Sequence, residues 1–244
     1  MNEVINVINN RRSTRVFKDE PIKEEHKNII IEAAINAPTA GNMMLYNIID
    51  VTNQELIDKL SVLCDNQPFM KNAKLVLLFV TNSNRWYDAY NKLNNANYKP
   101  TLSDYYLGLN DAIIACQNAV IAAESLNIGS CYIGDIVENY EKIKEIFKLP
   151  KYVNPACLAV FGYKVNEENK QRPKRFKVED VVFENEFIDK NIETFINKFD
   201  GNVETASKLI NGTFNFKMKS EFFEEMNRSL KLMVNEYIDD ADKE

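Results

Sequence analysis

"DYYLGLNDAIIACQNAVIAAESL" (residues 104–126) carries the strongest helical signal in this chain of 244 residues. Its apolar residues recur at intervals of three and four, which is the spacing of one face of a helix. This face consists of Leu109, Ala112, Ile113, Cys116, Ala119, Val120, Ala123 and Leu126. Further alanines keep the helix slim on its other sides, so we expect a central helix that packs against several elements.

The rest of the chain mixes helices with a few strands. Continuous apolar runs at residues 74–81 and 156–163 predict strands that are buried on both faces. Residues 45–52 are predicted to form another strand, and residues 130–134 a short strand or a turn. Apolar periodicity predicts helices over residues 3–10, 22–36, 54–64, 136–147, 187–199 and 220–238. This order predicts an α+β fold in the form of an α/β sandwich.

Composition and charge restrict the function. The formal net charge is -6 and the isoelectric point is near 5.1, which argues against general nucleic-acid binding because phosphate backbones select for an excess of Lys and Arg. The N-terminal stretch lacks the apolar core of a signal peptide, and the longest apolar runs are too short to span a bilayer. Four widely spaced cysteines without a CxxC motif predict reduced, buried thiols in a cytoplasmic protein, with no structural metal.

The chain contains a single histidine, His26, which we expect on the surface in the first turns of a helix. One histidine excludes most Ser-His-Asp and Cys-His mechanisms, because these need a histidine as the base. We therefore expect no catalytic side chain, and chemistry that comes from a cofactor.

Two basic clusters are candidate anion sites in this acidic chain. "RRSTR" (residues 11–15) follows directly on a predicted helix, and its guanidinium groups suit bidentate binding of phosphate oxygens. It is also open to interpretation as the cationic end of a helix or as a nucleic-acid patch. The second cluster is "RPKR" (residues 172–175), which, taken alone, is better explained as an exposed loop.

Two glycine-containing turns are further candidates. In "APTAGN" (residues 37–42), Pro38 ends a helix, Gly41 supplies a turn, and the amide of Asn42 can both donate and accept hydrogen bonds. A plain helix-to-strand connection is the alternative. Gly129 is expected to cap the long helix. Gly134 lies before a new predicted helix, where a glycine lets a backbone N–H approach a flat ligand.

In this order and spacing, the stretches resemble the FMN-dependent nitroreductase family. The resemblance covers about residues 4–184 and is carried by "RRSTRVFKDEPI" (11–22), "AINAPTAGN" (34–42), "NIGSCYIGDI" (127–136), and "AVFGY" (159–163) followed by the basic loop and "VEDVV". It implies a first domain over residues 1–184, with a central sheet flanked by helices, in an intertwined homodimer. The tail "FFEEMNRSL" (222–230) is similar to a C-terminal extension found in a subset of the family. We expect residues 185–244 to form such a helical extension, packed on the domain or on the partner subunit.

The resemblance also implies a site. Two FMN molecules would lie at the dimer interface, each held by both chains. Arg11, Arg12 and Ser13 would contact the phosphate and ribityl region, with Arg15 as a possible helper, and Arg175 would be the second phosphate ligand, with Lys174 or Arg172 nearby. Asn42 would bind the polar edge of the flavin, Pro38 and Thr39 would lie where the partner's loop approaches the ring, and the backbone at Ile133 and Gly134 would face flavin N5.

The implied activity is that of an NAD(P)H oxidoreductase. NADH or NADPH would give hydride to flavin N5, and a nitroaromatic, quinone or similar acceptor would then take the electrons in a ping-pong scheme. A flavin enzyme with one dedicated substrate and a non-catalytic FMN-binding protein are the alternatives.

The chain departs from the family pattern beside Asn42. Many members continue this loop as N-x-Q-P-W, whereas this sequence has "NMMLY" (residues 42–46), so this side of the flavin site is expected to be reshaped. The only tryptophan, Trp86, lies instead in a polar, aromatic stretch over residues 82–100. This stretch would form either a mobile lid over the flavin or a helix that packs its aromatic side chains.

Overall fold

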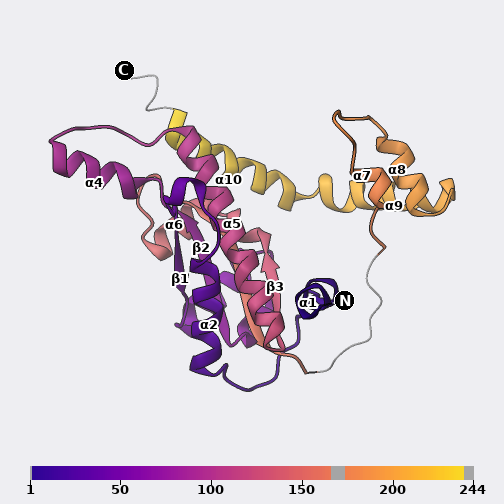
Figure 1. Cartoon of the computed structure of the whole chain (residues 1–244), viewed down its shortest axis with the longest axis horizontal. Coiled ribbons are helices and arrows are strands. Elements are labelled where there is room, and N and C mark those ends of the chain that lie inside the picture. The colour runs from indigo at the N-terminus through magenta and orange to yellow at the C-terminus, as the bar shows by residue number, and fades with distance from the viewer. Residues whose placement is uncertain (1, 166–173, 239–244) are drawn as a thin grey trace. The chain divides into compact units, whose positions relative to one another are not determined.

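The protein is described by a computed structural model that covers residues 2–165 and 174–238. Contacts within the chain group into two compact units: the first contains the residues up to 167 together with those from 225 on, and the second contains residues 168–224 (Figure 1). The predicted boundary between residues 184 and 185 falls inside the second unit. The two units are described separately below.

A four-stranded antiparallel sheet forms the centre of the first unit. Its strand order is β1 (Tyr46–Asp50), β2 (Leu75–Thr81), β4 (Pro155–Tyr163) and β3 (Ile128–Ile133). Strands β2 and β4 are central, and all residues of β2 and all but the last residue of β4 are buried. This confirms the prediction from their continuous apolar runs, because only a strand covered on both faces needs apolar residues at every position.

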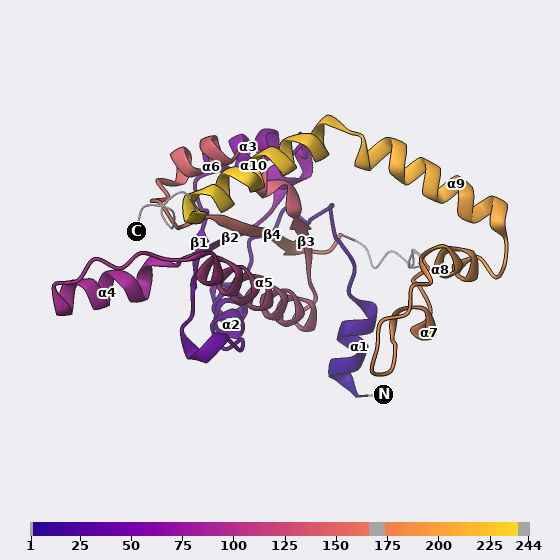
Figure 2. The ribbon, with the colours of Figure 1, turned by 90° about the horizontal axis from the view of Figure 1, so that it is seen from above.

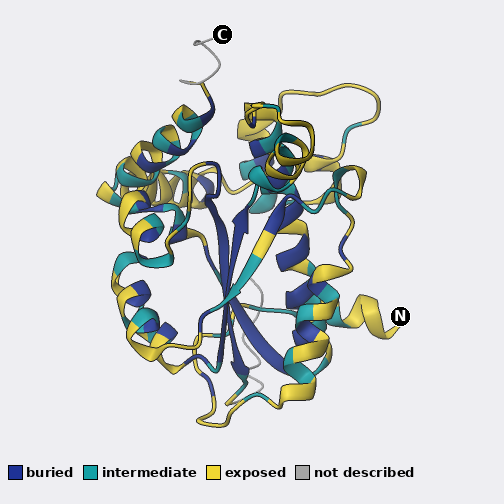
Figure 3. Cartoon of the chain, turned by 90° about the vertical axis from the view of Figure 1, so that its left-hand side faces the viewer, coloured by how far each residue is buried: buried dark blue, intermediate teal, exposed yellow. Residues whose placement is uncertain are grey.

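Helices cover both faces of the sheet (Figure 2). On one face lie α2 (Glu24–Ile35) and α5 (Leu102–Ser125), and on the other lie α3 (Gln54–Leu63), α6 (Tyr140–Phe147) and α10 (Glu221–Ile238) from Glu225 on. Two apolar cores result, one on each side of the sheet. Figure 3 shows the buried sheet between helices whose outer faces are exposed. The predicted α+β fold is confirmed.

Helix α5 is central to the first of these cores, as predicted. Its small residues allow close approach, and Ala112, Ala115, Cys116, Ala119 and Ala123 are all completely buried against the sheet and α2. The helix starts at a capping box formed by Thr101 and Asp104. It ends at Ser125, and the left-handed turn that follows is made by Asn127 with a φ of 58°. The prediction that Gly129 caps this helix is wrong, because Gly129 already lies in β3.

The segment after β3 differs from the predicted helix over residues 136–147. Residues Gly134–Val137 form a 3-10 turn (η3), and α6 begins only at Tyr140. Asn139 separates them with a φ of 48°, a left-handed conformation that cannot be part of a right-handed helix. Two further 3-10 turns, η1 (Ala40–Asn42) and η2 (Pro68–Asn72), connect helices to β1 and β2.

Two helices of the first unit lie outside these layers. Helix α1 (Glu3–Asn10) confirms the predicted helix over residues 3–10. Helix α4 (Asn84–Asn94), in the predicted 82–100 stretch, projects away from the sheet in Figures 1 and 2. Trp86 and Tyr90 on this helix are exposed, as is Tyr98 after it, so this helix does not bury most of its aromatic residues against the described residues.

The end of α10 docks on its own chain. Met233 and Tyr237 are buried in a cluster with Tyr105, Tyr140 and Tyr152. The second unit contains α7 (Val178–Val181), α8 (Asn191–Lys198), α9 (Val203–Thr213), a π-helical turn (Phe214–Met218) and the start of α10. In residues 2–165 and 174–238, no helix combines the length and apolar character needed to cross a membrane.

The thiols and the histidine have defined environments. All four cysteines are free and buried, as predicted. His26 lies in the first turn of α2, but it is half-buried rather than fully on the surface, and its Nδ1 lies 2.9 Å from the hydroxyl of Tyr163.

Candidate functional site

The N-terminal arginine cluster lies against the edge strand β3. Helix α1 ends at Asn10 with Arg11 as its C-cap, and the chain then pairs with the strand: Ser13 forms a bridge to Ser130, and the Thr14 N–H donates to the Ser130 carbonyl at 2.8 Å. Nη1 of Arg12 is buried and has no hydrogen-bond partner among the residues the structure describes. A buried guanidinium nitrogen without an acceptor is unusual in proteins, so this atom marks a position where an anion would be stabilised.

Two glycines allow this close pairing. Gly129 and Gly162 lie opposite each other in the register of β3 and β4. A Cβ on Gly129 would lie 2.4 Å from the Thr14 hydroxyl, and one on Gly162 would lie 2.7 Å from the Phe17 ring. Such distances are too short for real side chains, so both glycines let the N-terminal segment lie flat on the strands.

The charges around the Cys131 thiol on β3 affect its pKa. Burial raises the pKa of Cys131, whereas the guanidinium groups of Arg15 and Arg11 and the Ser13 hydroxyl act to lower it. The structure therefore brings these three predicted residues together around one strand. The guanidinium of Arg15 also lies 5.8 Å from the centre of the Phe69 ring, within the range of a cation–π contact.

The end of β3 presents open backbone. Ile133 is buried and ends the strand, and Gly134 is exposed at the start of η3. A Cβ built on Gly134 would meet no atom within 4 Å among the described residues. Among the described residues, the space beside this backbone is therefore open, and the approach of a flat ligand to it stays a prediction.

Pro38, Thr39 and Asn42 lie on the loop between α2 and β1. Three residues of this loop have left-handed backbone conformations: Gly41 (φ 54°), Asn42 (φ 58°) and Met44 (φ 50°). The Asn42 side chain is exposed and makes no hydrogen bond to any described residue. Its amide is therefore available to a ligand or to another chain.

Sequence reasoning missed the side chains that hold this loop. They are Asp111 on α5 and Arg85 and Trp86 on α4, which all bond to the loop backbone. The available signal was Asp111, an acidic residue in the middle of the most apolar helix of the sequence. Buried carboxyl groups need hydrogen-bond donors, so its position pointed to a partner outside the helix.

The second basic cluster belongs to the other unit. Lys174 and Arg175 are exposed, and Lys174 Nζ pairs with Asp200 at 2.7 Å. Arg172 lies outside the described residues. The role of this cluster at a phosphate stays a prediction.

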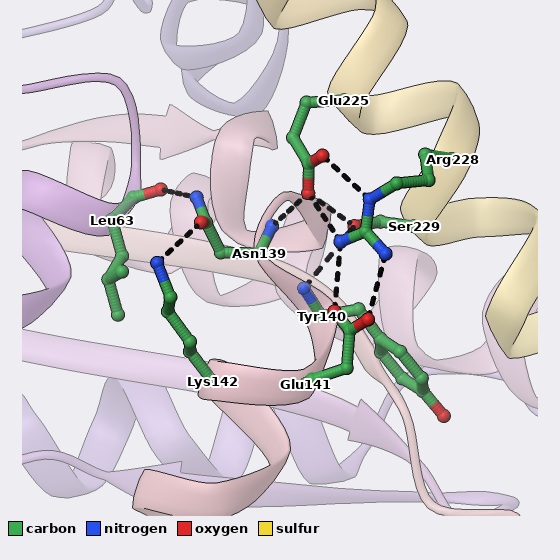
Figure 4. A network of polar contacts seen from close by, with 8 residues as sticks. All are labelled: Leu63, Asn139, Tyr140, Glu141, Lys142, Glu225, Arg228 and Ser229. Atoms are coloured by element: carbon green, nitrogen blue, oxygen red, sulfur yellow. Dashed lines mark hydrogen bonds and ion pairs between the residues drawn. The ribbon is translucent and has the colours of Figure 1, made fainter.

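The turn after η3 is tied to α10 (Figure 4). Arg228 donates to both carboxyl oxygens of Glu141, at 2.8 and 2.9 Å, and to Glu225, which in turn accepts the Asn139 N–H at 3.0 Å. The hydrogen bonds that Glu225 accepts, above all those from Arg228, lower its pKa to about 2. Ser229 Oγ accepts the Tyr140 N–H at 3.3 Å. The segment that carries Gly134 is thus fixed at its far end by the returning C-terminal helix.

Glu138 in this turn is a buried carboxyl group near other acids. Burial, followed by repulsion from Asp135, Asp65 and Glu225, raises its pKa to about 7, and its Oε1 has no hydrogen-bond partner in the described part of the chain. The folded protein binds a proton on the Glu138 carboxyl group more tightly than the unfolded chain does. The stability that the protonated carboxyl group contributes is therefore fully present below about pH 4.5 and is lost as the pH rises through 7.

Replacing Glu138 by glutamine is therefore expected to stabilise the fold at pH 8, by up to about 3 kcal/mol, and much less at pH 5. Urea unfolding at both pH values measures the difference. The exposed Glu145 on α6 provides the control, since its change to glutamine should have the same small effect at both pH values. An equal effect of Glu138→Gln at pH 5 and pH 8 would contradict the assignment.

A cavity of about 270 Å³ lies elsewhere in the first unit. Its walls come from the end of β1, the start of β2, helices α2 and α3 and neighbouring turns, and include Lys27, Asp50, Lys71 and Lys74. None of the predicted flavin contacts lines it, and Lys27 is paired with Asp50, so this cavity is not the candidate site.

Comparison with known proteins agrees with this geometry. The model of the nitroreductase family matches residues 8–163. The chain is 36% identical to an FMN reductase [NAD(P)H] of Bacillus subtilis over 173 residues, which is 70% of each protein, and 28% identical to an FMN reductase (NADPH) of the same organism over 100% of this chain and 98% of that protein.

The fold also matches that of solved structures. The structure of B. megaterium NfrA2 superposes with a TM-score of 0.82 at 29% identity, and the match covers 96% of this chain and 98% of that one. The family match spans more than half of the chain and includes the arginine cluster, the Asn42 loop and the Gly134 turn. This chain belongs to the nitroreductase family.

Proposed function

We propose that this protein is an FMN-dependent NAD(P)H oxidoreductase of the nitroreductase type. The observation that carries the proposal is the buried Nη1 of Arg12, which has no hydrogen-bond partner among the described residues. Arg12 directly precedes Ser13, which bridges to Ser130 of β3, and this strand leads to the open backbone of Gly134. The N-terminal segment thus offers a cationic donor for a phosphate, and the strand with which it pairs leads to an accessible backbone for a flat ring. Relatives named as FMN reductases support the same cofactor.

The residues present fit FMN. Arg11, Arg12 and Ser13 would bind the phosphate and the ribityl chain, with Arg15 beside them. Arg175 and Lys174 would add positive charge from the second basic cluster. Two clusters far apart in the sequence would then neutralise one dianionic phosphate by charge-assisted hydrogen bonds.

The ring would be held by backbone and amide groups. Asn42 would bind its polar edge, Pro38 and Thr39 would lie beside the ring near the partner's loop, and the backbone N–H groups at Ile133 and Gly134 would face N5. A hydrogen-bond donor at the polar edge stabilises negative charge on the reduced ring. When bound, FMN supplies the acceptance and release of hydride, which explains why no ionisable side chain is needed.

We also infer a cytoplasmic homodimer with the FMN sites between subunits. Support comes from apolar side chains that one chain leaves exposed on α1 and α5, among them Ile5, Ile8, Ile113 and Ile114. Four buried free thiols fit a reducing compartment. Residues 1–184 would form the flavin-binding domain and residues 185–244 its helical extension.

Steady-state kinetics test the proposal. With NADPH or NADH as donor and a quinone or nitroaromatic as acceptor, double-reciprocal plots should give parallel lines, because donor and acceptor use the same site in turn. Intersecting lines would contradict the ping-pong scheme. Turnover of one narrow acceptor from a panel would favour a dedicated enzyme, and no turnover with FMN bound would favour a binding protein.

A further inference from the structure

The Asn42 loop keeps an unfavourable backbone conformation. Asn42 and Met44 both have positive φ values, 58° and 50°, although neither is glycine. Each such residue costs about 1 kcal/mol or more, and persists only where surrounding contacts hold it. Contacts from other elements must therefore hold the loop that carries the exposed Asn42.

Asp111 holds the loop from the side of α5. Its side chain is 2% exposed, Oδ1 accepts the Ala40 N–H at 3.0 Å, and Oδ2 accepts the Leu45 N–H at 3.1 Å. One carboxyl group thus joins the two ends of the turn that contains Asn42. Gly108, one helical turn earlier, permits this approach, because a Cβ there would lie 2.7 Å from the Leu45 carbonyl oxygen.

Helix α4 holds the loop through its carbonyl groups. Arg85 donates from Nη1 to the Met44 oxygen at 2.7 Å and from Nη2 to the Tyr46 oxygen at 3.0 Å. Trp86 Nε1 donates to the Met43 oxygen at 2.9 Å while the residue remains 53% exposed. Helix α5 therefore binds the N–H groups at the two ends of the turn, and α4 binds the carbonyl groups of Met43, Met44 and Tyr46.

From these contacts we infer that Asp111, with Arg85 opposite it, is a positioning residue that aims the Asn42 amide at the polar edge of the flavin. The inference rests on the proposed function. Asp111 fixes the backbone on both sides of Asn42 but leaves the Asn42 side chain itself without a protein partner among the described residues. A rigid backbone that carries a free amide is what preorganised binding of a ligand requires.

The test is a double-mutant cycle on the FMN-loaded enzyme, read out as the rate of flavin reduction by NADPH or NADH in anaerobic stopped flow. Asn42→Ala removes the amide. Asp111→Asn keeps the shape of the side chain but turns an NH₂ group toward one of the two N–H donors. We expect each single variant to be reduced about 10- to 100-fold more slowly, and the double variant no more slowly than Asn42→Ala alone.

The only tryptophan gives a second readout that does not depend on flavin. Because Trp86 bonds to the same loop, Asp111→Asn should increase acrylamide quenching of its fluorescence. The matched control is Glu124→Gln, which neutralises another buried carboxyl group on α5 that pairs with Lys164 at 2.6 Å. This control should change neither the reduction rate nor the quenching.

The reduction rates of these variants either support or overturn the inference. If the folded Asp111→Asn enzyme is reduced like the wild type while Asn42→Ala is slow, or if the two effects multiply in the double variant, Asp111 does not act through Asn42 and the inference is overturned. A wild-type rate for Asn42→Ala overturns it too, and leaves the proposed function intact. A wild-type protein that NADPH and NADH both fail to reduce refutes the proposed function itself. Should Asp111→Asn not fold, Arg85→Lys replaces it in the same cycle.

Discussion

Replacing Arg12 by alanine is expected to strip FMN from the purified protein. The variant loses charge-assisted hydrogen bonds to the phosphate, which are worth about 3 kcal/mol, or about 100-fold in the dissociation constant. The wild type should be yellow after purification and the variant colourless. Visible absorbance gives the occupancy, and quenching of added FMN gives the affinity.

The matched control is Lys18→Ala in the same N-terminal segment. Lys18 is an exposed cation for which no flavin contact is predicted, so its removal changes the overall charge by the same amount. FMN occupancy should remain that of the wild type. If the Arg12→Ala variant retains as much FMN as the wild type, the buried nitrogen of Arg12 is not a phosphate ligand and the assignment of residues 11–13 is wrong.

Replacing Tyr237 by alanine is expected to destabilise the fold by about 4 kcal/mol. Tyr237 is 2% exposed, and its ring centre lies 5.2 Å from that of Tyr105 and 5.1 Å from that of Tyr152. Its hydroxyl donates to the Tyr152 carbonyl at 3.1 Å and lies 3.2 Å from the Ser83 hydroxyl. The substitution therefore leaves both a cavity and unsatisfied polar groups.

Thermal unfolding measures this effect, with a decrease in Tm of about 10 °C or more expected for a chain of this size. Tyr237→Phe keeps the ring and should lose only about 1 kcal/mol. The neighbouring residue Ile238 is half-exposed, and its change to alanine should have a minor effect. A Tyr237→Ala protein with the Tm of the Ile238→Ala control would mean that the end of α10 does not anchor on its own chain in solution.

The elements that follow from periodicity alone were predictable. Strands β2 and β4 have apolar residues at almost every position, and α5 has small apolar residues at helical spacing, so burial on both faces and a central position follow directly. The arginine cluster was found because clustered positive charge is unusual in an acidic protein. Asn42 was found because its amide lies on a short loop. The order of both stretches in the chain also resembles that of a known family.

The contacts between distant segments were not predictable in the same way. Gly129 is a strand residue that pairs with Gly162, and its lack of a Cβ leaves room for Thr14, which is far away in sequence. Asn139 directly precedes α6 in a left-handed conformation, and its backbone N–H donates to the carboxyl group of Glu225. Asp111 binds a loop about 70 residues earlier in the chain. In each case tertiary packing overrides the local pattern, which a single sequence does not reveal.

Anaerobic reduction of the FMN-loaded protein is the most direct test of the central claim. Each nicotinamide is added in turn while the visible flavin absorbance is followed, and a quinone is then added. The account predicts that NADPH, NADH or both bleach the flavin and that the quinone restores its colour. A protein that binds FMN tightly, yet keeps its full absorbance with excess NADPH and with excess NADH, would contradict it.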